Sequence, residues 1–127
     1  LVKAAPVVLS AERVRRGRAQ AVLVNSGNAN AYTGRTGTAV AREMCGLVAR
    51  ELGIAESLVL PSSTGRIGQQ LPRARVRRGV VEACRALARD GFHRALEGIM
   101  TTDAFPKFAF ERVLLDGAEV TIAGMAK

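Results

Sequence analysis

The segment Pro61–Gly68 has the residue types of an anion-binding turn. It reads Pro-Ser-Ser-Thr-Gly-Arg-Ile-Gly and follows a short apolar run, Leu58–Leu60. Pro61 is expected to end a strand, and Gly65 permits backbone conformations that a side chain would block. Such a turn can aim a backbone N–H and a hydroxyl at one point, about 2.7–3.1 Å from a developing negative charge. The segment therefore suggests an oxyanion hole; taken alone, it also fits a plain Ser-rich loop.

A second polar loop, Thr101–Lys107, places two hydroxyls and a carboxylate before Pro106. Such a group can orient a small substrate, although helix capping or turn formation explains the same residues. With residues 25–34 and 61–68, this loop is one of three polar segments at the ends of apolar elements. Loops on a rigid scaffold commonly carry functional sites.

The sequence contains no recognisable set of residues for a catalytic triad, a catalytic thiol or a metal site. His93 is the only histidine, so no Ser-His-Asp set can be assembled, and a nucleophile must be activated differently or lie outside this chain. Cys45 and Cys84 are the only cysteines and form no CxxC motif, so no metal site is predicted. Both are interpreted as small buried hydrophobic residues of a reducing compartment, because no base is paired with either thiol.

The length fits one domain, residues 1–127, and both ends are interpreted as cuts in a longer protein. Hydrophobic residues make up 48% of the chain, enough for a core. No apolar run approaches the roughly 20 residues of a membrane span, and nothing resembles a signal peptide. The net charge of +8 suggests nucleic-acid binding as a function. The basic residues are, however, spread along the chain, and aromatic residues make up only 4% of it, which argues against that function. A non-catalytic basic binding module remains an alternative.

Apolar patterns predict an alternation of strands and helices in the first half of the chain. Residues 1–9 are interpreted as strand sequence, and 19–24 and 58–60 as short buried strands. Between them, an apolar stripe predicts a helix, capped by Thr36 or Thr38 and ended by Gly53. The stripe consists of Val40, Met44, Leu47 and Val48.

The chain from Pro72 onward is predicted to be two helices followed by a hairpin. Pro72 suits the first turn of one helix, which Asp90-Gly91 would stop. Its apolar stripe consists of Val76, Val80, Ala83 and Leu87. A shorter helix follows at residues 92–97. Asp116-Gly117 lies between the apolar runs 108–115 and 118–123, which is typical of a type I′ hairpin.

Four blocks of the chain together resemble one known family. They are VLVNSGNANAYTG (22–34), LPSSTGRIGQQLP (60–72), IMTTDAFPK (99–107) and GMAK (124–127). In this order they are similar to the signatures of ornithine acetyltransferase, the bifunctional glutamate N-acetyltransferase of arginine biosynthesis. The resemblance spans nearly the whole chain.

The resemblance implies a precursor that cuts itself before a threonine. That threonine becomes the N-terminal nucleophile of the β chain, and its own amine can serve as the base. This sequence resembles most of the α chain, with the N-terminal portion and the β chain missing. It ends just before the expected Gly-rich segment and Ala-Thr cleavage site. The resemblance thus implies that this chain alone is inactive.

Four residues take roles from the family motifs. Thr64 and Gly65 match the pair that forms the oxyanion hole, while Thr101 and Lys127 match substrate-binding positions. The Lys127 ammonium would hold a substrate carboxylate.

The sequence departs from the family pattern at two positions. Arg66 stands where a small apolar residue is usual, and Ala104 stands where a hydroxyl is usual. Because of these two departures, the motifs do not determine the exact substrate, and a secondary-metabolism paralogue remains an alternative.

The resemblance also implies the remaining properties. The reaction would be a ping-pong acetyl transfer from N-acetylornithine to glutamate, without a metal or bound cofactor; acetyl-CoA is the donor in some members. The fold would be a layered α/β sandwich with two β-sheets between helices, resembling N-terminal-nucleophile hydrolases. The partners would be its own β chain and a second αβ unit, giving a cytoplasmic heterotetramer. A self-processing aminopeptidase of related fold is a further alternative.

Overall fold

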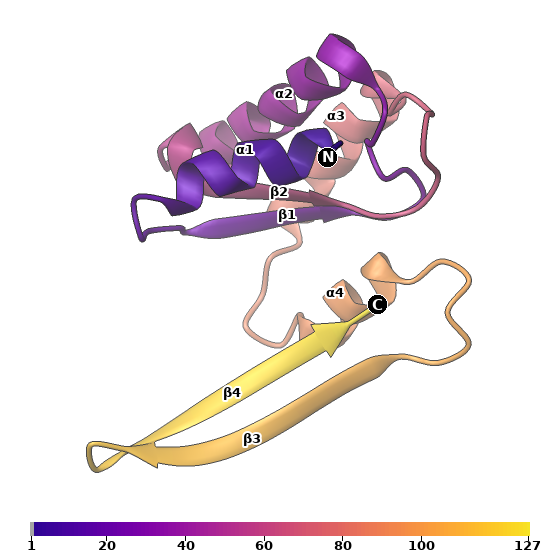
Figure 1. The fold of residues 1–127 in the computed structure, drawn as a ribbon. Coiled ribbons are helices and arrows are strands. Elements are labelled where there is room, and N and C mark those ends of the chain that lie inside the picture. Colours follow the sequence, from indigo (N-terminus) through magenta and orange to yellow (C-terminus); the bar gives the residue numbers. More distant parts are fainter. Residues whose placement is uncertain (1) are drawn as a thin grey trace. The chain divides into compact units, whose positions relative to one another are not determined.

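The computed structural model describes residues 2–127. They form two compact units, divided between Ala88 and Arg89 (Figure 1). Unit 1 contains three α-helices and unit 2 contains one, and each unit has its own two-stranded sheet, so the predicted α/β class with two sheets is confirmed. That both units belong to a single domain stays a prediction.

Unit 1 is a small parallel sheet with helices on one face. Its elements, in chain order, are α1 (Ala5–Val14), β1 (Ala21–Asn25), α2 (Gly34–Leu52), the short 3₁₀ turn Glu56–Leu58, β2 (Val59–Ser63) and α3 (Arg73–Arg85). The two strands pair in parallel, from Ala21 opposite Val59 to Asn25 opposite Ser63. The three helices lie on the same side of this sheet (Figure 1). Because the strands are parallel, both carboxyl ends meet at one edge, where the polar loops begin.

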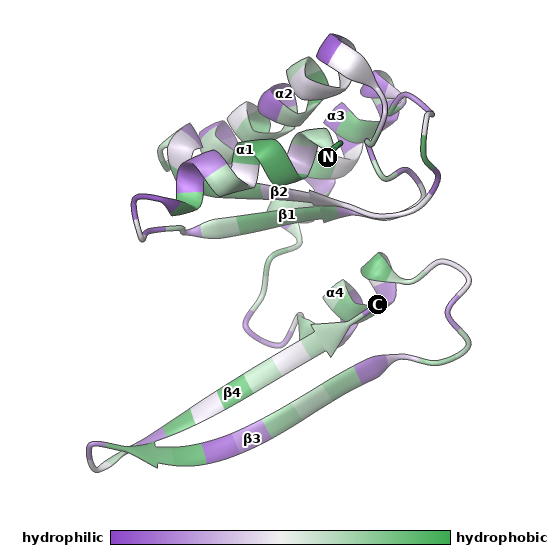
Figure 2. Ribbon diagram, in the orientation of Figure 1, coloured by the Kyte–Doolittle hydropathy of each residue, from purple (hydrophilic) through white to green (hydrophobic). Residues whose placement is uncertain are grey.

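The core of unit 1 lies between the helices and the covered face of the sheet. Its buried members are Leu9, Val40, Ala41, Met44, Cys45, Val48, Ala49, Val59, Leu71 and Val80. Along β1 the side chains alternate, so Ala21 and Leu23 pack against this core while Val22 and Val24 are exposed. Figure 2 shows that β1 is nonetheless largely apolar.

The strand expected within residues 1–9 is wrong, because Ala5–Val14 forms helix α1. Pro6 lies in the first helical turn, where its fixed backbone angle is favourable and its missing N–H costs nothing. Leu9 and Arg13 are four residues apart and both buried, so they share one helical face. Packing of that face outweighs the strand preference of Val7 and Val8.

Helix α2 carries the predicted apolar stripe and ends as predicted. Gly53 follows it with φ +65°, a left-handed conformation that suits glycine. Its start differs, because the residue before the first turn is Thr33 rather than Thr36 or Thr38. The Thr33 hydroxyl donates to Asn30 Oδ1 at 2.7 Å instead of capping the helix. The loop before α2 thus fixes where the helix begins.

Strand β2 continues through Pro61, so the expected strand end at this residue is wrong. β2 pairs only with β1 among the described strands, and proline is tolerated where an N–H is not needed for pairing. The Pro61 carbonyl accepts a hydrogen bond of 2.8 Å from Ser10 Oγ, which ties β2 to α1.

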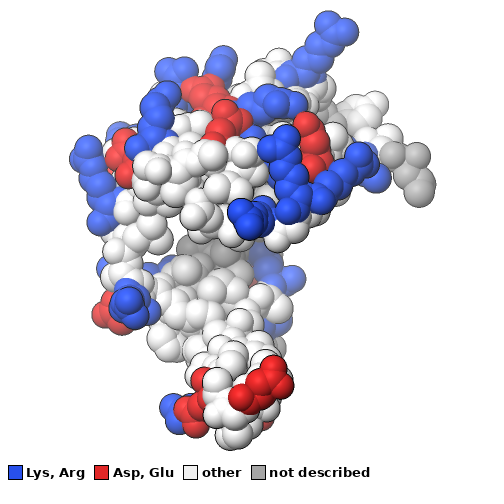
Figure 3. Space-filling view, turned by 90° about the vertical axis from the view of Figure 1, so that its left-hand side faces the viewer, with Lys and Arg blue, Asp and Glu red and all other residues white. Residues whose placement is uncertain are grey.

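Helix α3 is shorter than expected. It begins just after Pro72 and ends at Arg85, so Leu87 lies beyond it and is exposed, whereas Val80 is buried. Its arginines are exposed as predicted, and Arg73 and Arg77 both pair with Glu43 on α2. Figure 3 shows the left-hand side of the Figure 1 view, where basic side chains are interspersed with acidic ones rather than forming a continuous basic patch.

Unit 2 consists of α4 (Phe92–Ile99) and a long hairpin, β3 (Lys107–Leu115) and β4 (Ala118–Ala126). The strands pair antiparallel, from Lys107 opposite Ala126 to Leu115 opposite Ala118. Asp116 and Gly117 have φ of 49° and 82°, as a type I′ turn requires, so the predicted hairpin is confirmed. Rings of α4 and β3 pack together at one end: Phe92, His93, Phe108 and Phe110.

The cysteines and the histidine lie in structural positions. Cys45 is fully buried and Cys84 is partly buried; neither forms a disulfide, and burial raises the pKa of both thiols. His93 packs edge-to-face against Phe108. Within residues 2–127 no three potential ligands from His, Cys, Asp and Glu gather at one point, and no helix is long and apolar enough to cross a membrane.

Candidate functional site

The Thr64–Gly65 turn follows β2 and is held against the loop that follows β1. The N–H of Thr64 donates to the Asn25 carbonyl at 3.0 Å, and the N–H of Arg66 donates to the Gly27 carbonyl at 3.0 Å. Ala29 returns a bond of 2.9 Å to the Arg66 carbonyl. The parallel pairing thus continues past both strands, and the turn has a fixed backbone path.

Gly65 is required at its position for two independent reasons. Its φ is +127°, a conformation that other residues rarely adopt. A Cβ built there would lie 2.3 Å from the carbonyl carbon of Gly27 and 2.7 Å from the backbone nitrogen of Asn28. Since both obstacles are backbone atoms, no side-chain movement can relieve the clash.

The turn presents a backbone donor and a hydroxyl that are not used elsewhere in the described chain. The N–H groups of Thr64 and Arg66 donate to carbonyls of the β1 loop, whereas the N–H of Gly65, between them, does not. No residue among 2–127 accepts a hydrogen bond from that N–H or engages the half-buried Thr64 hydroxyl. A backbone N–H and a side-chain hydroxyl are among the donors that form oxyanion holes.

Side chains brace this turn from the β1 loop. Ser63 Oγ donates to Asn25 Oδ1 at 2.6 Å, and Asn25 Nδ2 donates to the Asn28 carbonyl at 2.9 Å. One asparagine therefore connects the end of β2 with its own loop. Sequence reasoning assigned no such role to Asn25.

Asn30 fixes the same loop from inside the fold. It is fully buried with φ +48°, and its Nδ2 donates to the Gly37 carbonyl at 2.9 Å while its Oδ1 accepts from Thr33. Its own carbonyl accepts the N–H of Ala5, at the start of α1. An asparagine is favoured here because it tolerates the left-handed region and supplies both a donor and an acceptor.

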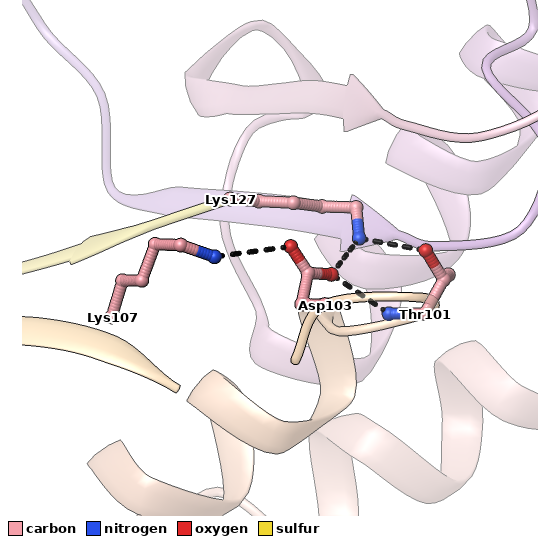
Figure 4. A network of polar contacts seen from close by, with 4 residues as sticks. All are labelled: Thr101, Asp103, Lys107 and Lys127. Atoms are coloured by element: carbon pink, nitrogen blue, oxygen red, sulfur yellow. Dashed lines mark hydrogen bonds and ion pairs between the residues drawn. The ribbon is translucent and has the colours of Figure 1, made fainter. Parts of the chain in front are cut away.

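In unit 2, the candidate substrate-binding residues are in direct contact (Figure 4). Lys127 Nζ donates to Thr101 Oγ1 at 2.7 Å and also donates to Asp103 Oδ2. The Thr101 N–H donates to the same Asp103 oxygen at 3.0 Å. Lys107 Nζ lies 3.5 Å from Asp103 Oδ1. We call these four residues the Lys127 cluster.

The Lys127 cluster carries a persistent negative charge between two ammonium groups. The hydrogen bond from Lys127, followed by that from the Thr101 backbone, holds the pKa of the Asp103 carboxyl well below its usual range. The carboxylate is therefore ionised at neutral pH, and the cluster contains two positive charges and one negative charge. This arrangement suits an anionic ligand.

Comparison with known proteins identifies the family. The family model described as ArgJ family matches residues 1–127. This chain belongs to the ArgJ family. It is 53% identical, over its whole length, to the arginine biosynthesis bifunctional protein ArgJ of Symbiobacterium thermophilum, and 45% identical over 99% of its length to that of Caldanaerobacter subterraneus subsp. tengcongensis. It spans 32% and 31% of these relatives, about a third of their length.

Two crystal structures share the fold of this ArgJ-family chain. One is the ArgJ protein of Bacillus halodurans and the other is the ornithine acetyltransferase of Mycobacterium tuberculosis complexed with ornithine. Both are 35% identical with a TM-score of 0.89 over 98% of this chain, which covers 66% and 67% of theirs. The fold is thus that of ArgJ proteins, which resembles N-terminal-nucleophile hydrolases, as predicted.

The four expected site residues of the ArgJ motifs occur as two pairs. Thr64 and Gly65 adjoin in unit 1, while Thr101 and Lys127 are hydrogen-bonded in unit 2. Asp103 was predicted only as part of a polar loop. A carboxylate two residues from Thr101 is a signal in the sequence, but its link to Lys127 spans 24 residues and follows only from the fold.

The two departures from the family pattern lie on the surface. Arg66 and Ala104 are both exposed. The pairing of Arg66 with the β1 loop uses only backbone atoms, so its side chain does not alter the turn.

Proposed function

We propose that the full-length protein transfers an acetyl group from N-acetylornithine to glutamate, through an acetyl-threonine on a chain not included here. One relative of known structure is named an ornithine acetyltransferase and was crystallised with ornithine, and others are named bifunctional proteins of arginine biosynthesis. These names describe the relatives, and they support the same acyltransferase chemistry for this protein.

The Thr64–Gly65 turn carries the proposal. In the first half-reaction the threonine oxygen of the partner chain attacks the acetyl carbonyl, and the carbonyl oxygen becomes negative. The Gly65 N–H and the Thr64 hydroxyl, unused by the described chain, would donate to that oxygen. The C–N bond then breaks, and ornithine leaves with a proton on its amine. Glutamate attacks the resulting ester with its amine, through the same negative intermediate, and restores the threonine hydroxyl.

The Lys127 cluster would hold a carboxylate common to both substrates. Both N-acetylornithine and glutamate carry an α-carboxylate, which an ammonium and a hydroxyl can bind together. Thr101 and Lys127 supply these two groups in contact with one another.

Self-cleavage of a precursor would supply the nucleophile on a separate β chain. The present chain covers about a third of the curated relatives but about two thirds of the polypeptides in the crystal structures. Those polypeptides are therefore about half as long as the curated sequences, which supports a division into two chains. We propose an assembly of two α and two β chains. The present chain alone would be inactive, because the nucleophile lies on the β chain.

We further propose that no metal or bound cofactor takes part and that the enzyme acts in the cytoplasm. In a bifunctional enzyme acetyl-CoA would be a second acetyl donor, which would acylate the same threonine.

Steady-state kinetics and mass spectrometry of the full-length protein test this proposal. Parallel double-reciprocal lines for N-acetylornithine and glutamate are expected, with an acetyl adduct on the N-terminal threonine of the β chain. Residues 1–127 expressed alone should form no adduct. A stable adduct on any residue of this chain, with turnover, would refute the assignment.

The alternative classes predict different results. A self-processing aminopeptidase would release amino acids from peptides without acetyl transfer, but the family match over residues 1–127 favours the acyltransferase. A basic binding module would bind DNA with a steep salt dependence. A secondary-metabolism paralogue would retain the acetyl-enzyme but prefer a different amine as acceptor.

A further inference from the structure

Asp103 joins the members of the Lys127 cluster. Its Oδ2 accepts from both Lys127 Nζ and the Thr101 N–H, while its Oδ1 faces Lys107 (Figure 4). Only 13% of its side chain is exposed. Without Asp103, the single direct link between Lys127 and the 101–106 loop would be one hydrogen bond to the Thr101 hydroxyl.

The hairpin register brings these residues together. Lys107, the first residue of β3, pairs with Ala126, the last residue of β4. Lys127 therefore emerges beside the loop that precedes β3 and can reach Asp103 and Thr101. Its position along the chain follows from the register, but the direction of its flexible side chain does not. A flexible lysine side chain needs a fixed partner to hold one orientation.

Two hydrogen-bond donors of the Lys127 cluster remain available to a ligand. An ammonium has three N–H donors, and Lys127 uses two of them on Thr101 and Asp103. Thr101 Oγ1 accepts from Lys127, so the hydroxyl proton of Thr101 must point away from the ammonium. The third N–H of Lys127 and this hydroxyl proton start from atoms 2.7 Å apart. That spacing suits the two oxygens of one carboxylate.

The net charge of the Lys127 cluster also favours a carboxylate as the ligand. Lys127 and Lys107 contribute two positive charges, and Asp103 cancels one of them. The cluster keeps one net positive charge even though Lys127 is paired. Asp103 therefore orients Lys127 without removing the attraction for a monoanionic group.

We propose that Asp103 is a positioning residue for substrate binding, holding Lys127 and Thr101 so that together they bind one substrate carboxylate. The inference rests on the proposed function. Asp103 itself touches no substrate and acts through Lys127.

A double-mutant cycle in the full-length enzyme tests this role. Asp103→Ala should raise KM for both N-acetylornithine and glutamate by about tenfold, with kcat changed less than about twofold. In a Lys127→Ala background, the same change should alter KM by less than about twofold, because the residue that Asp103 orients is already absent. Asp90→Asn is the matched control, since that carboxylate is 91% exposed in the same unit.

Each other outcome overturns the inference in a recognisable way. Additive effects of the two substitutions would show that Asp103 acts independently of Lys127. A lower KM for Asp103→Ala would show that its charge merely opposes substrate binding. A fall in kcat alone, in proportion to the fraction of cleaved enzyme, would show a purely structural role.

A second variant covers the case in which Asp103→Ala does not fold. Asp103→Asn keeps the size of the side chain and an oxygen that can accept the Thr101 N–H, but it lacks the charge that holds Lys127. It should raise KM several-fold, and a KM equal to that of the wild type would refute the proposal. If Lys127→Ala itself leaves KM unchanged while acetyl transfer persists, the substrate site is misassigned but the reaction stands. Loss of acetyl transfer in the wild-type protein would instead refute the proposed function.

Discussion

The Thr64–Gly65 turn and the Lys127 cluster are built by different kinds of force. The turn is positioned by backbone hydrogen bonds and by the contact of Gly65 with the Gly27–Asn28 backbone. The cluster is positioned by charged side chains at the partly exposed end of a hairpin. Steric constraints leave no room for substitution and do not respond to pH or salt. Charge–charge contacts tolerate substitution better but depend on both.

Gly65→Ala should have the largest effect of the substitutions considered, because it disrupts the sterically fixed Thr64–Gly65 turn. The added Cβ would overlap backbone atoms, and the positive φ would be strained, so the turn must move. Since a shift of about 1 Å can cost 10²-fold or more in rate, we expect a fall in kcat of at least about 10³-fold, measured by acetyl transfer in the full-length enzyme.

Gly79→Ala is the matched control for that substitution. Gly79 lies within α3, and nothing occupies the space around an added Cβ. It should leave kcat unchanged and slightly stabilise the helix. Equal activity of both variants would mean that the Gly65 turn is outside the site.

Thr64→Ala separates the hydroxyl of the turn from its backbone. The backbone path is kept and one oxyanion donor is lost, so kcat should fall by roughly 10²–10³-fold. Thr64→Ser should keep most of the activity, and Thr36→Ala, on the exposed surface of α2, should keep all of it. Activity of correctly cleaved Thr64→Ala within about twofold of wild type would remove Thr64 from the site.

Lys127→Ala tests the charged side of the contrast. Loss of one member of a charge pair costs about 2–5 kcal/mol when the pair is buried, and the lower end applies here because 21% of the side chain is exposed. KM for both substrates should therefore rise by about 30-fold, with a smaller loss in kcat. Lys127→Arg should recover part of the affinity, since it keeps the charge. Unchanged kinetics of Lys127→Ala would make Lys127 a surface charge only.

Acid should weaken the Lys127 cluster before it affects the Thr64–Gly65 turn. The pKa of Asp103 is lower in the folded protein than in the unfolded chain, so below about pH 4 the unfolded chain takes up the proton first. The stabilisation is therefore complete above about pH 4 and is lost as the pH falls further. The expected result is a difference in melting temperature between wild type and Asp103→Asn that is constant near neutrality and shrinks in acid. A difference independent of pH would contradict it.

Local patterns in the sequence were sufficient for some elements and insufficient for others. The hairpin and α2 were predictable, because Asp116-Gly117, the apolar stripe and Gly53 act within a few residues. Helix α1 was not, because it depends on burying Leu9 and Arg13 against distant elements. The guanidinium of Arg13 contacts the Val59 carbonyl and Glu56, more than forty residues away.

The site shows the same division. Gly65 stood out as a glycine after a hydroxyl-rich strand end, but its closeness to Gly27 follows only from the pairing of β1 with β2. Lys127 was assigned through motif resemblance alone, whereas Thr101 also lay in a polar loop that its residue types had marked. Thr101 contacts Asp103 within the same loop, but the link from Lys127 to Asp103 depends on the hairpin register.

The turn at Asp116-Gly117 has a consequence for how this hairpin can evolve. It sets the alignment of nine residue pairs, at the far end of which Lys127 follows β4. Deleting one residue from β4 would shift its remaining side chains to the opposite face of the sheet and carry Lys127 away from Asp103. Most positions of the two strands are exposed in the described chain, so single replacements there disturb its own packing little. Over evolutionary time, the composition of this hairpin can drift far more freely than its length.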